Sequence, residues 1–149
     1  WEPLINGSKK YISLPAIEGE HSVITRFKNA YGDITTVKEN NDVLKYVLDK
    51  TSPELLMETV NGTRITKQNG VLLNLTAIDN LSKNIKMTLV SNGLEMLVNG
   101  VTLNTVTLSN NTEQEIYING LKQGFNVISF DVQDEAGNTD TKTLRIYKK

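Results

Sequence analysis

The last 24 residues alternate between apolar and polar side chains in two runs, and this pattern limits the fold more than any other feature. In the first run, Ile128, Phe130 and Val132 occupy every second position. The second run places Leu144 and Ile146 in the same way. Alternation with a period of two is typical of strands that bury one face. Residues 134–138 between the runs contain Gly137 and short polar side chains, which favour a tight turn. The sequence therefore predicts a hairpin that closes an antiparallel sheet.

A weaker copy of this hairpin precedes it in the chain. Residues 19–33 and 124–138 each begin with glycine, continue with an alternating run and reach a second glycine after the same interval. The first turn reads Asn29-Ala30-Tyr31-Gly32-Asp33, so its end residues differ in type from those of the second turn. An internal repeat of this kind indicates two modules of related structure.

The repeat divides the chain into three predicted parts. Residues 1–49 contain three candidate strands (11–14, 22–27 and 43–48), too few to enclose a core, so we expect a partial domain with the C-terminal strands only. Residues 50–53 end in Pro53 and are expected to form a stiff linker. Residues 54–149 show short strands with turn signals between them, including Asn92-Gly93 and Asn99-Gly100, two pairs typical of two-residue hairpin turns. The predicted strands of this part are 55–60, 71–77, 85–89, 94–98, 101–108, 115–118, 127–132 and 143–147.

Several short strings resemble tandem bacterial immunoglobulin-like domains: DVQDEAGN before the terminal strand, DKTSP at the linker, and AIDN with VNG in the second part. The resemblance implies an all-β fold, an immunoglobulin-like antiparallel β-sandwich, with one complete domain preceded by a partial or atypical one. It also implies an extracellular location in a bacterium, either secreted or attached to the cell surface. The absence of cysteine suits such a product, and it excludes disulfides and thiolate chemistry.

Charge and motifs argue against several classes of function. The net charge of −1 provides no basic surface for nucleic acid, and no apolar run is long enough for membrane insertion. His21 is the sole histidine, and no catalytic motif accompanies it. We therefore expect a non-catalytic spacer or accessory module whose partners are neighbouring domains of the same polypeptide. The alternative is an adhesin or carbohydrate-binding module with a host or cell-wall ligand, for which the aromatic candidates are Phe125, Phe130, Tyr117 and Tyr147.

One group of residues has the chemistry of a metal site. In an immunoglobulin-like sandwich, the loop between the second and third strands and the loop between the sixth and seventh strands lie at the end where the chain enters. That arrangement would gather Asp49, Asp79 and Asp134, together with Asn80 and Asp131. Carboxylate oxygens suit Ca²⁺, so Asp49, Asp79 and Asp134 form a candidate calcium site. The alternative is that these aspartates only stabilise turns through local hydrogen bonds. No other cofactor is indicated.

Overall fold

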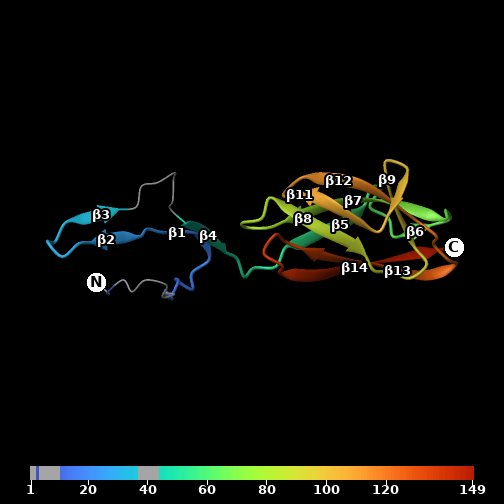
Figure 1. The fold of residues 1–149 in the computed structure, drawn as a ribbon. Helices are drawn as coiled ribbons and strands as arrows, with labels where there is room; N and C mark the ends of the chain where they lie inside the picture. Colours follow the sequence, from blue (N-terminus) through green and yellow to red (C-terminus); the bar gives the residue numbers. More distant parts are fainter. Residues whose placement is uncertain (1–2, 4–10, 37–43) are drawn as a thin grey trace. The chain divides into compact units, whose positions relative to one another are not determined.

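The computed structural model describes residue 3, residues 11–36 and residues 44–149. Its contacts divide the chain into residues 1–49 and residues 50–149. The described parts consist of strands and turns, and none of their segments is a helix long and apolar enough to span a membrane. The all-β class expected from the sequence is therefore confirmed (Figure 1).

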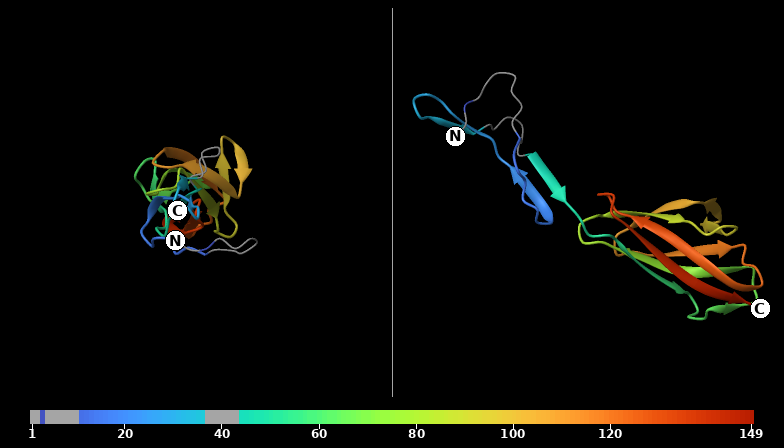
Figure 2. Two further views of the ribbon diagram at one scale, coloured as in Figure 1. Left: turned by 60° about the vertical axis from the view of Figure 1, so that its left-hand side comes forward. Right: turned by 90° about the horizontal axis from the view of Figure 1, so that it is seen from below.

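Residues 50–149 form two five-stranded sheets that face each other across one core (Figures 1 and 2). All strand pairs are antiparallel except the parallel pair of β14 with β6. The first sheet has the order β10 (Val101–Leu103), β9 (Glu95–Val98), β12 (Glu113–Asn119), β7 (Gly70–Ile78) and β5 (Glu54–Thr59). The second sheet has the order β11 (Thr105–Ser109), β8 (Asn84–Leu89), β13 (Gly124–Gln133), β14 (Thr139–Lys148) and β6 (Ile65–Thr66).

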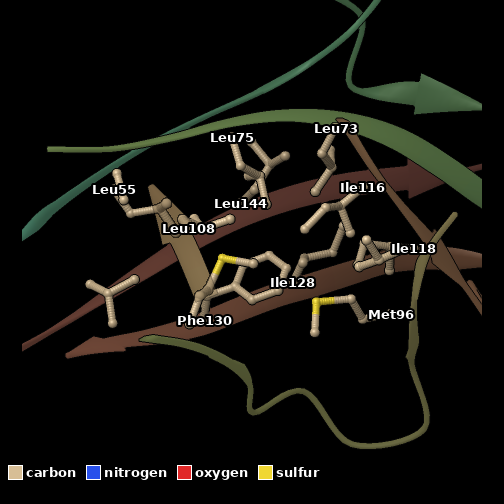
Figure 3. Close-up of a cluster of buried hydrophobic side chains, with 14 of the residues drawn as sticks. Leu55, Leu73, Leu75, Met96, Leu108, Ile116, Ile118, Ile128, Phe130 and Leu144 are labelled. Atoms are coloured by element: carbon tan, nitrogen blue, oxygen red, sulfur yellow. The ribbon is translucent and has the colours of Figure 1, made fainter. Parts of the chain in front are cut away.

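Alternate residues of both sheets meet in a single hydrophobic core (Figure 3). On β13, which lies between β8 and β14, every second residue from Asn126 to Val132 is buried. Alternation predicts eight core residues most clearly, of which seven are buried and Leu89 is partly buried. The eight are Leu73, Leu75, Met87, Leu89, Ile128, Phe130, Leu144 and Ile146. The buried apolar side chains are Leu55, Leu73, Leu75, Ala77, Ile85, Met87, Met96, Val98, Leu108, Ile116, Ile118, Leu121, Ile128, Phe130, Val132, Leu144 and Ile146.

Residues 1–49 contain two pairs of short strands among their described residues. Strand β1 (Gly19–Val23) pairs with β4 (Leu44–Leu48), and β2 (Arg26–Lys28) pairs with β3 (Ile34–Thr36). Across residues 11–34 and 44–48, no apolar side chain is buried. The strand predicted over 11–14 is wrong, and the one predicted over 22–27 is interrupted between β1 and β2. That these residues form part of a larger domain stays a prediction.

The two turns of the sequence repeat have the same hydrogen bonds with the end residues exchanged. In the first turn, the backbone N–H and the side-chain amide of Asn29 donate to the carbonyl and carboxylate of Asp33. In the second, the backbone N–H of Asp134 donates to the carbonyl of Asn138, whose side-chain amide donates back to the Asp134 carboxylate. The second and third positions of the motif also differ in residue type, but the glycine has φ +95° at Gly32 and φ +97° at Gly137. The exchange of Asp and Asn therefore preserves the turn.

Two details of the second part differ from the sequence prediction. The run 101–108 is two strands, because the chain leaves the first sheet after Leu103 and joins the second at Thr105. Between them, the carbonyl of Asn104 accepts a hydrogen bond from the backbone of Leu89. Asn99-Gly100 forms the expected hairpin turn, with both residues at positive φ. Asn92-Gly93 does not, since β8 and β9 on either side of it belong to different sheets.

Candidate functional site

Asp79 follows the last residue of β7 and forms a tight turn there. Its Oδ1 accepts hydrogen bonds from the backbone N–H groups of Leu81 (2.9 Å) and Ser82 (2.6 Å). Such side-chain-to-backbone bonds are the usual reason for aspartate in a turn. The residue is 9% exposed, and its Oδ2 is buried without a hydrogen-bond partner. The turn therefore accounts for the position of Oδ1. It does not account for Oδ2, because a buried acceptor normally has a hydrogen-bond donor.

The side chain of Asn110, the residue after β11, fixes this turn. Its side-chain amide donates to the carbonyls of Asp79 (2.7 Å) and Ser82 (2.8 Å), and its oxygen accepts from the Asp79 backbone (3.0 Å). Three hydrogen bonds from one side chain hold the Asp79 carboxylate at a defined position. Asn110 was not predicted from the sequence, where the only signal for it is an Asn-Asn pair after a predicted strand.

Asp134 occupies the corresponding place after β13. Its Oδ1 accepts a hydrogen bond from the backbone of Asn138 (2.8 Å), and its Oδ2 accepts one from the Asn138 side chain (2.7 Å). The same Asn138 amide also donates to the carbonyl of Thr51, just before β5 (3.3 Å). Asp134 is 7% exposed, so its carboxylate is buried with neutral amides as donors.

Two hydrogen bonds join the turn of Asp79 to the turn of Asp134. The Oγ of Ser82 accepts from the backbone of Glu135 (3.1 Å), and Asn84 donates to the Glu135 carboxylate (2.9 Å). Ser82 is itself buried. The two turns therefore lie side by side at one end of the sandwich, as the predicted topology requires.

Asp49 completes the predicted group. It is the residue before Lys50, and its Oδ2 has less than 1 Å² of accessible surface. One carboxylate oxygen from each of Asp49, Asp79 and Asp134 lies within 4.8 Å of the other two. The structure thus brings together the three residues named from the sequence, while Asp131 is exposed and accepts a hydrogen bond from Thr141 instead (2.7 Å). That these three aspartates bind a metal stays a prediction.

A second feature lies on the outer face of the second sheet, on β13 and β14. Phe125 on β13 is 80% exposed and contacts Tyr147 on β14 edge to face, with 5.0 Å between the ring centroids. Together with Arg64, Ile65 and Arg145, these two rings line a shallow apolar depression. Of the other aromatic candidates, Tyr117 is 37% exposed and Phe130 is fully buried.

Phe130 therefore belongs to the core, as its alternation with Ile128 indicates. The contribution of Arg64 and Ile65 was not predicted from the sequence, because a strand of two residues such as β6 shows no detectable alternation.

His21 lies on β1 and contacts two nearby residues, Tyr46 and Ile17. Its ring stacks on Tyr46 of β4, with centroids 4.9 Å apart, and its Nε2 lies 2.6 Å from the carbonyl oxygen of Ile17. These are contacts of a strand residue with its neighbours.

Comparison with known proteins gave similar solved structures, of which two are described here. No family model and no curated protein matches the chain. A lipoprotein from Bacteroides thetaiotaomicron aligns over 69% of this chain and 86% of its own, at 13% identity and a TM-score of 0.48. The adhesin InvE of Yersinia pseudotuberculosis aligns over 87% of this chain and 40% of its own, at 12% identity and a TM-score of 0.42. Similarity of this strength assigns neither family nor function.

Proposed function

We propose that the chain is a non-catalytic structural or accessory module of a multidomain bacterial protein that is secreted or attached to the cell surface. In this proposal, residues 54–149 space or present neighbouring domains of the same polypeptide, which are the chain's principal partners. The single observation that carries the proposal is the position of the two ends of the sandwich.

The chain enters and leaves the sandwich at opposite ends. Glu54, the first residue of β5, pairs with Ile78, the last residue of β7. Lys148, the last residue of β14, donates to the side chain of Asn69, directly before β7 begins (2.6 Å). The two ends are thus separated by the nine residues of β7, which corresponds to about 30 Å at 3.4 Å per residue. Figures 1 and 2 show the C-terminus at the end opposite the linker.

This arrangement suits a spacer because a domain placed before it and a domain placed after it are held apart. A module whose termini lie together would instead project sideways from its parent chain. One edge strand of each sheet is short, which supports the same role: β6 has two residues and β10 has three. Short edges limit pairing with other sheets, which matters for modules held close together.

Strand order supports the finer proposal of an immunoglobulin-like domain. The run β5-β7-β12-β9 corresponds to strands A, B, E and D, and β8-β13-β14 corresponds to C, F and G. The order departs from that fold at β11, which lies beside β8 but follows β9 and β10 in the chain. We therefore propose an immunoglobulin-like core to which β10 and β11 are added, one at an edge of each sheet.

Two experiments in the source bacterium test this function. Antibodies against residues 54–149 should label intact cells or detect the protein in the medium, and detection only inside lysed cells would contradict the proposed location. Replacement of residues 54–149 by an unrelated β-sandwich of equal end-to-end length should preserve the activity of the parent protein. Deletion of the same residues should reduce that activity, and loss of activity with the replacement would exclude a spacer.

The exposed Phe125–Tyr147 pair favours a second candidate, a binding module for an acidic polysaccharide. The two rings provide an apolar platform on adjacent strands, and Arg64 and Arg145 beside it provide two guanidinium groups. Arginine pairs with carboxylates through two parallel hydrogen bonds, and aromatic lining is typical of ligand sites. A cell-wall or host glycan that carries carboxylates would match both features.

This candidate is tested by titration with a uronic acid polymer and with a neutral glucan. Binding of the acidic polymer only, lost in Phe125→Ala, would support it. Because Phe125 is exposed, that variant keeps the core intact. Equal binding by wild type and Phe125→Ala, or no binding at all, would exclude this surface.

A further inference from the structure

We propose that the outer face of the second sheet binds the outer face of the first sheet on a second copy of this chain, with the two copies side by side and pointing in the same direction. Both faces belong to residues 50–149. Each face has an exposed apolar row that crosses neighbouring strands and a charged row beside it, and the two charges are opposite. A second copy therefore supplies the complement of each face.

The basic face, on the second sheet, consists of Phe125, Tyr147, Ile65, Arg64 and Arg145. Its apolar row crosses three strands, because Phe125 of β13 lies opposite Tyr147 of β14, which lies opposite Ile65 of β6. The three side chains are 80%, 38% and 51% exposed. Arg145 lies two residues before Tyr147 on the same face of β14, and Arg64 lines the same depression. Positive charge thus lies directly beside an exposed apolar row.

The acidic face, on the first sheet, repeats this arrangement with the opposite charge. Leu72 of β7 lies opposite Tyr117 of β12, and both side chains are exposed. Two residues along these strands, Asn74 lies between Glu115 of β12 and Glu58 of β5. Negative charge therefore lies beside an exposed apolar row here as well.

The difference in charge extends over both sheets. The strands of the first sheet, all of which the structure describes, contain five exposed glutamates and no lysine or arginine. Lys142 of β14 lines a depression beside Glu58 and Glu113, so the acidic face keeps an excess of negative charge. The five glutamates are Glu54, Glu58, Glu95, Glu113 and Glu115.

The spacing of the rows sets the relative direction of the two copies. In both faces the charged row lies two residues from the apolar row, which is about 7 Å along a strand. In both it lies on the side nearer the start of β5, since Leu72 is near the start of β7, whose last residue pairs with Glu54, and Tyr147 is near the end of β14. Packed sheets keep their strand directions within about 30° of each other. Both pairs of rows therefore meet only when the copies point the same way.

The charged groups of both faces are available for such a contact. Among the residues that the structure describes, Arg64, Arg145, Glu58 and Glu115 form no ion pair within the chain. Arginine can bind a carboxylate through two parallel hydrogen bonds, and contact between the apolar rows removes both from water. The contact is small, so we expect a Kd of about 10⁻⁴–10⁻³ M.

A weak contact of this kind suits parent proteins that extend from one surface. Because the two contacting faces differ, each copy can bind one neighbour on either side and form a row. Attachment to a common surface raises the effective concentration and strengthens the association. The basic face is also the candidate surface for an acidic polysaccharide. A second copy is the better match, because its carboxylates lie beside an apolar row at the same spacing.

The test is sedimentation equilibrium of residues 1–149 without any glycan, from about 10 µM to about 1 mM. Arg145→Glu disrupts the basic face and Glu115→Lys disrupts the acidic face. Lys86→Glu is the matched control, since Lys86 lies opposite the last residue of β13, at the other end of that strand from Phe125. We expect association of the wild type to weaken at least about tenfold in the first two variants. In Lys86→Glu it should stay within about twofold, because salt at 0.15 M screens charges beyond about 8 Å.

An equimolar mixture of Arg145→Glu and Glu115→Lys tests whether two different faces meet. Each variant retains the face that the other has lost, so the mixture should associate within about threefold of the wild type although neither variant does so alone. A wild type that stays monomeric at about 1 mM, variants that associate like the wild type, a mixture that stays monomeric, or an equal loss in Lys86→Glu would overturn the proposal. None of these outcomes bears on the spacer function.

Discussion

The substitution of Phe130 by alanine tests the packing on which the fold depends. Phe130 is fully buried on β13, the strand that pairs with β8 on one side and β14 on the other. Figure 3 shows its ring among the other side chains of the core. Removal of a fully buried phenylalanine ring costs about 3–5 kcal/mol, because the transfer free energy is lost and a cavity remains. A domain of this size has about 5–15 kcal/mol of total stability, so the variant should lose a large share of it.

Phe125 provides the matched control, since it lies on the same strand and faces the other way. Its side chain is 80% exposed and contacts the ring of Tyr147. Phe125→Ala should therefore cost about 1 kcal/mol or less, the value of an aromatic pair at the surface. The assay is urea unfolding followed by circular dichroism, with the free energy of unfolding extrapolated to water for each variant.

The comparison removes the same ring from two positions of opposite parity. Equal losses at the two positions, or a loss below about 1 kcal/mol for Phe130→Ala, would show that the assignment of inner and outer faces on β13 is wrong.

Two further predictions concern the second part of the chain. Residues 54–149 expressed alone should unfold cooperatively, because the seventeen apolar side chains that are buried among the described residues all lie within them, whereas residues 1–49 alone should show no transition; an unfolded 54–149 fragment would contradict the division. Asn110→Ala should lower the stability by about 1–3 kcal/mol, since it leaves the carbonyls of Asp79 and Ser82 without their donor; a neutral effect in urea unfolding would show that water replaces the side chain.

Alternation was sufficient to predict the strands that bury one face. Ile128, Phe130, Leu144 and Ile146 all point into the core, as their spacing indicates. The aspartates could also be grouped from the sequence, because in an immunoglobulin-like sandwich the loop between the second and third strands and the loop between the sixth and seventh strands lie at the end where the chain enters.

Other features depend on contacts that no local pattern contains. The break at Asn104 arises because the chain changes sheets there, although the sequence on both sides is equally strand-like. Strand β6 consists of two residues that pair with β14, so its first residue, Ile65, and the preceding Arg64 could not be assigned to the aromatic surface from the sequence. Asn110 stabilises the Asp79 turn from 31 residues away, a distance that local rules for turns do not cover.

The most direct test of the spacer function is the distance between the two ends of the sandwich in solution. The chain has no cysteine, so Ser52→Cys and Lys149→Cys provide two unique sites for spin labels. Double electron–electron resonance should give one narrow distribution centred between about 30 and 40 Å, the length of β7 plus the label linkers. A distribution centred below about 20 Å, or one that covers the whole measurable range, would contradict a module that holds its neighbours apart.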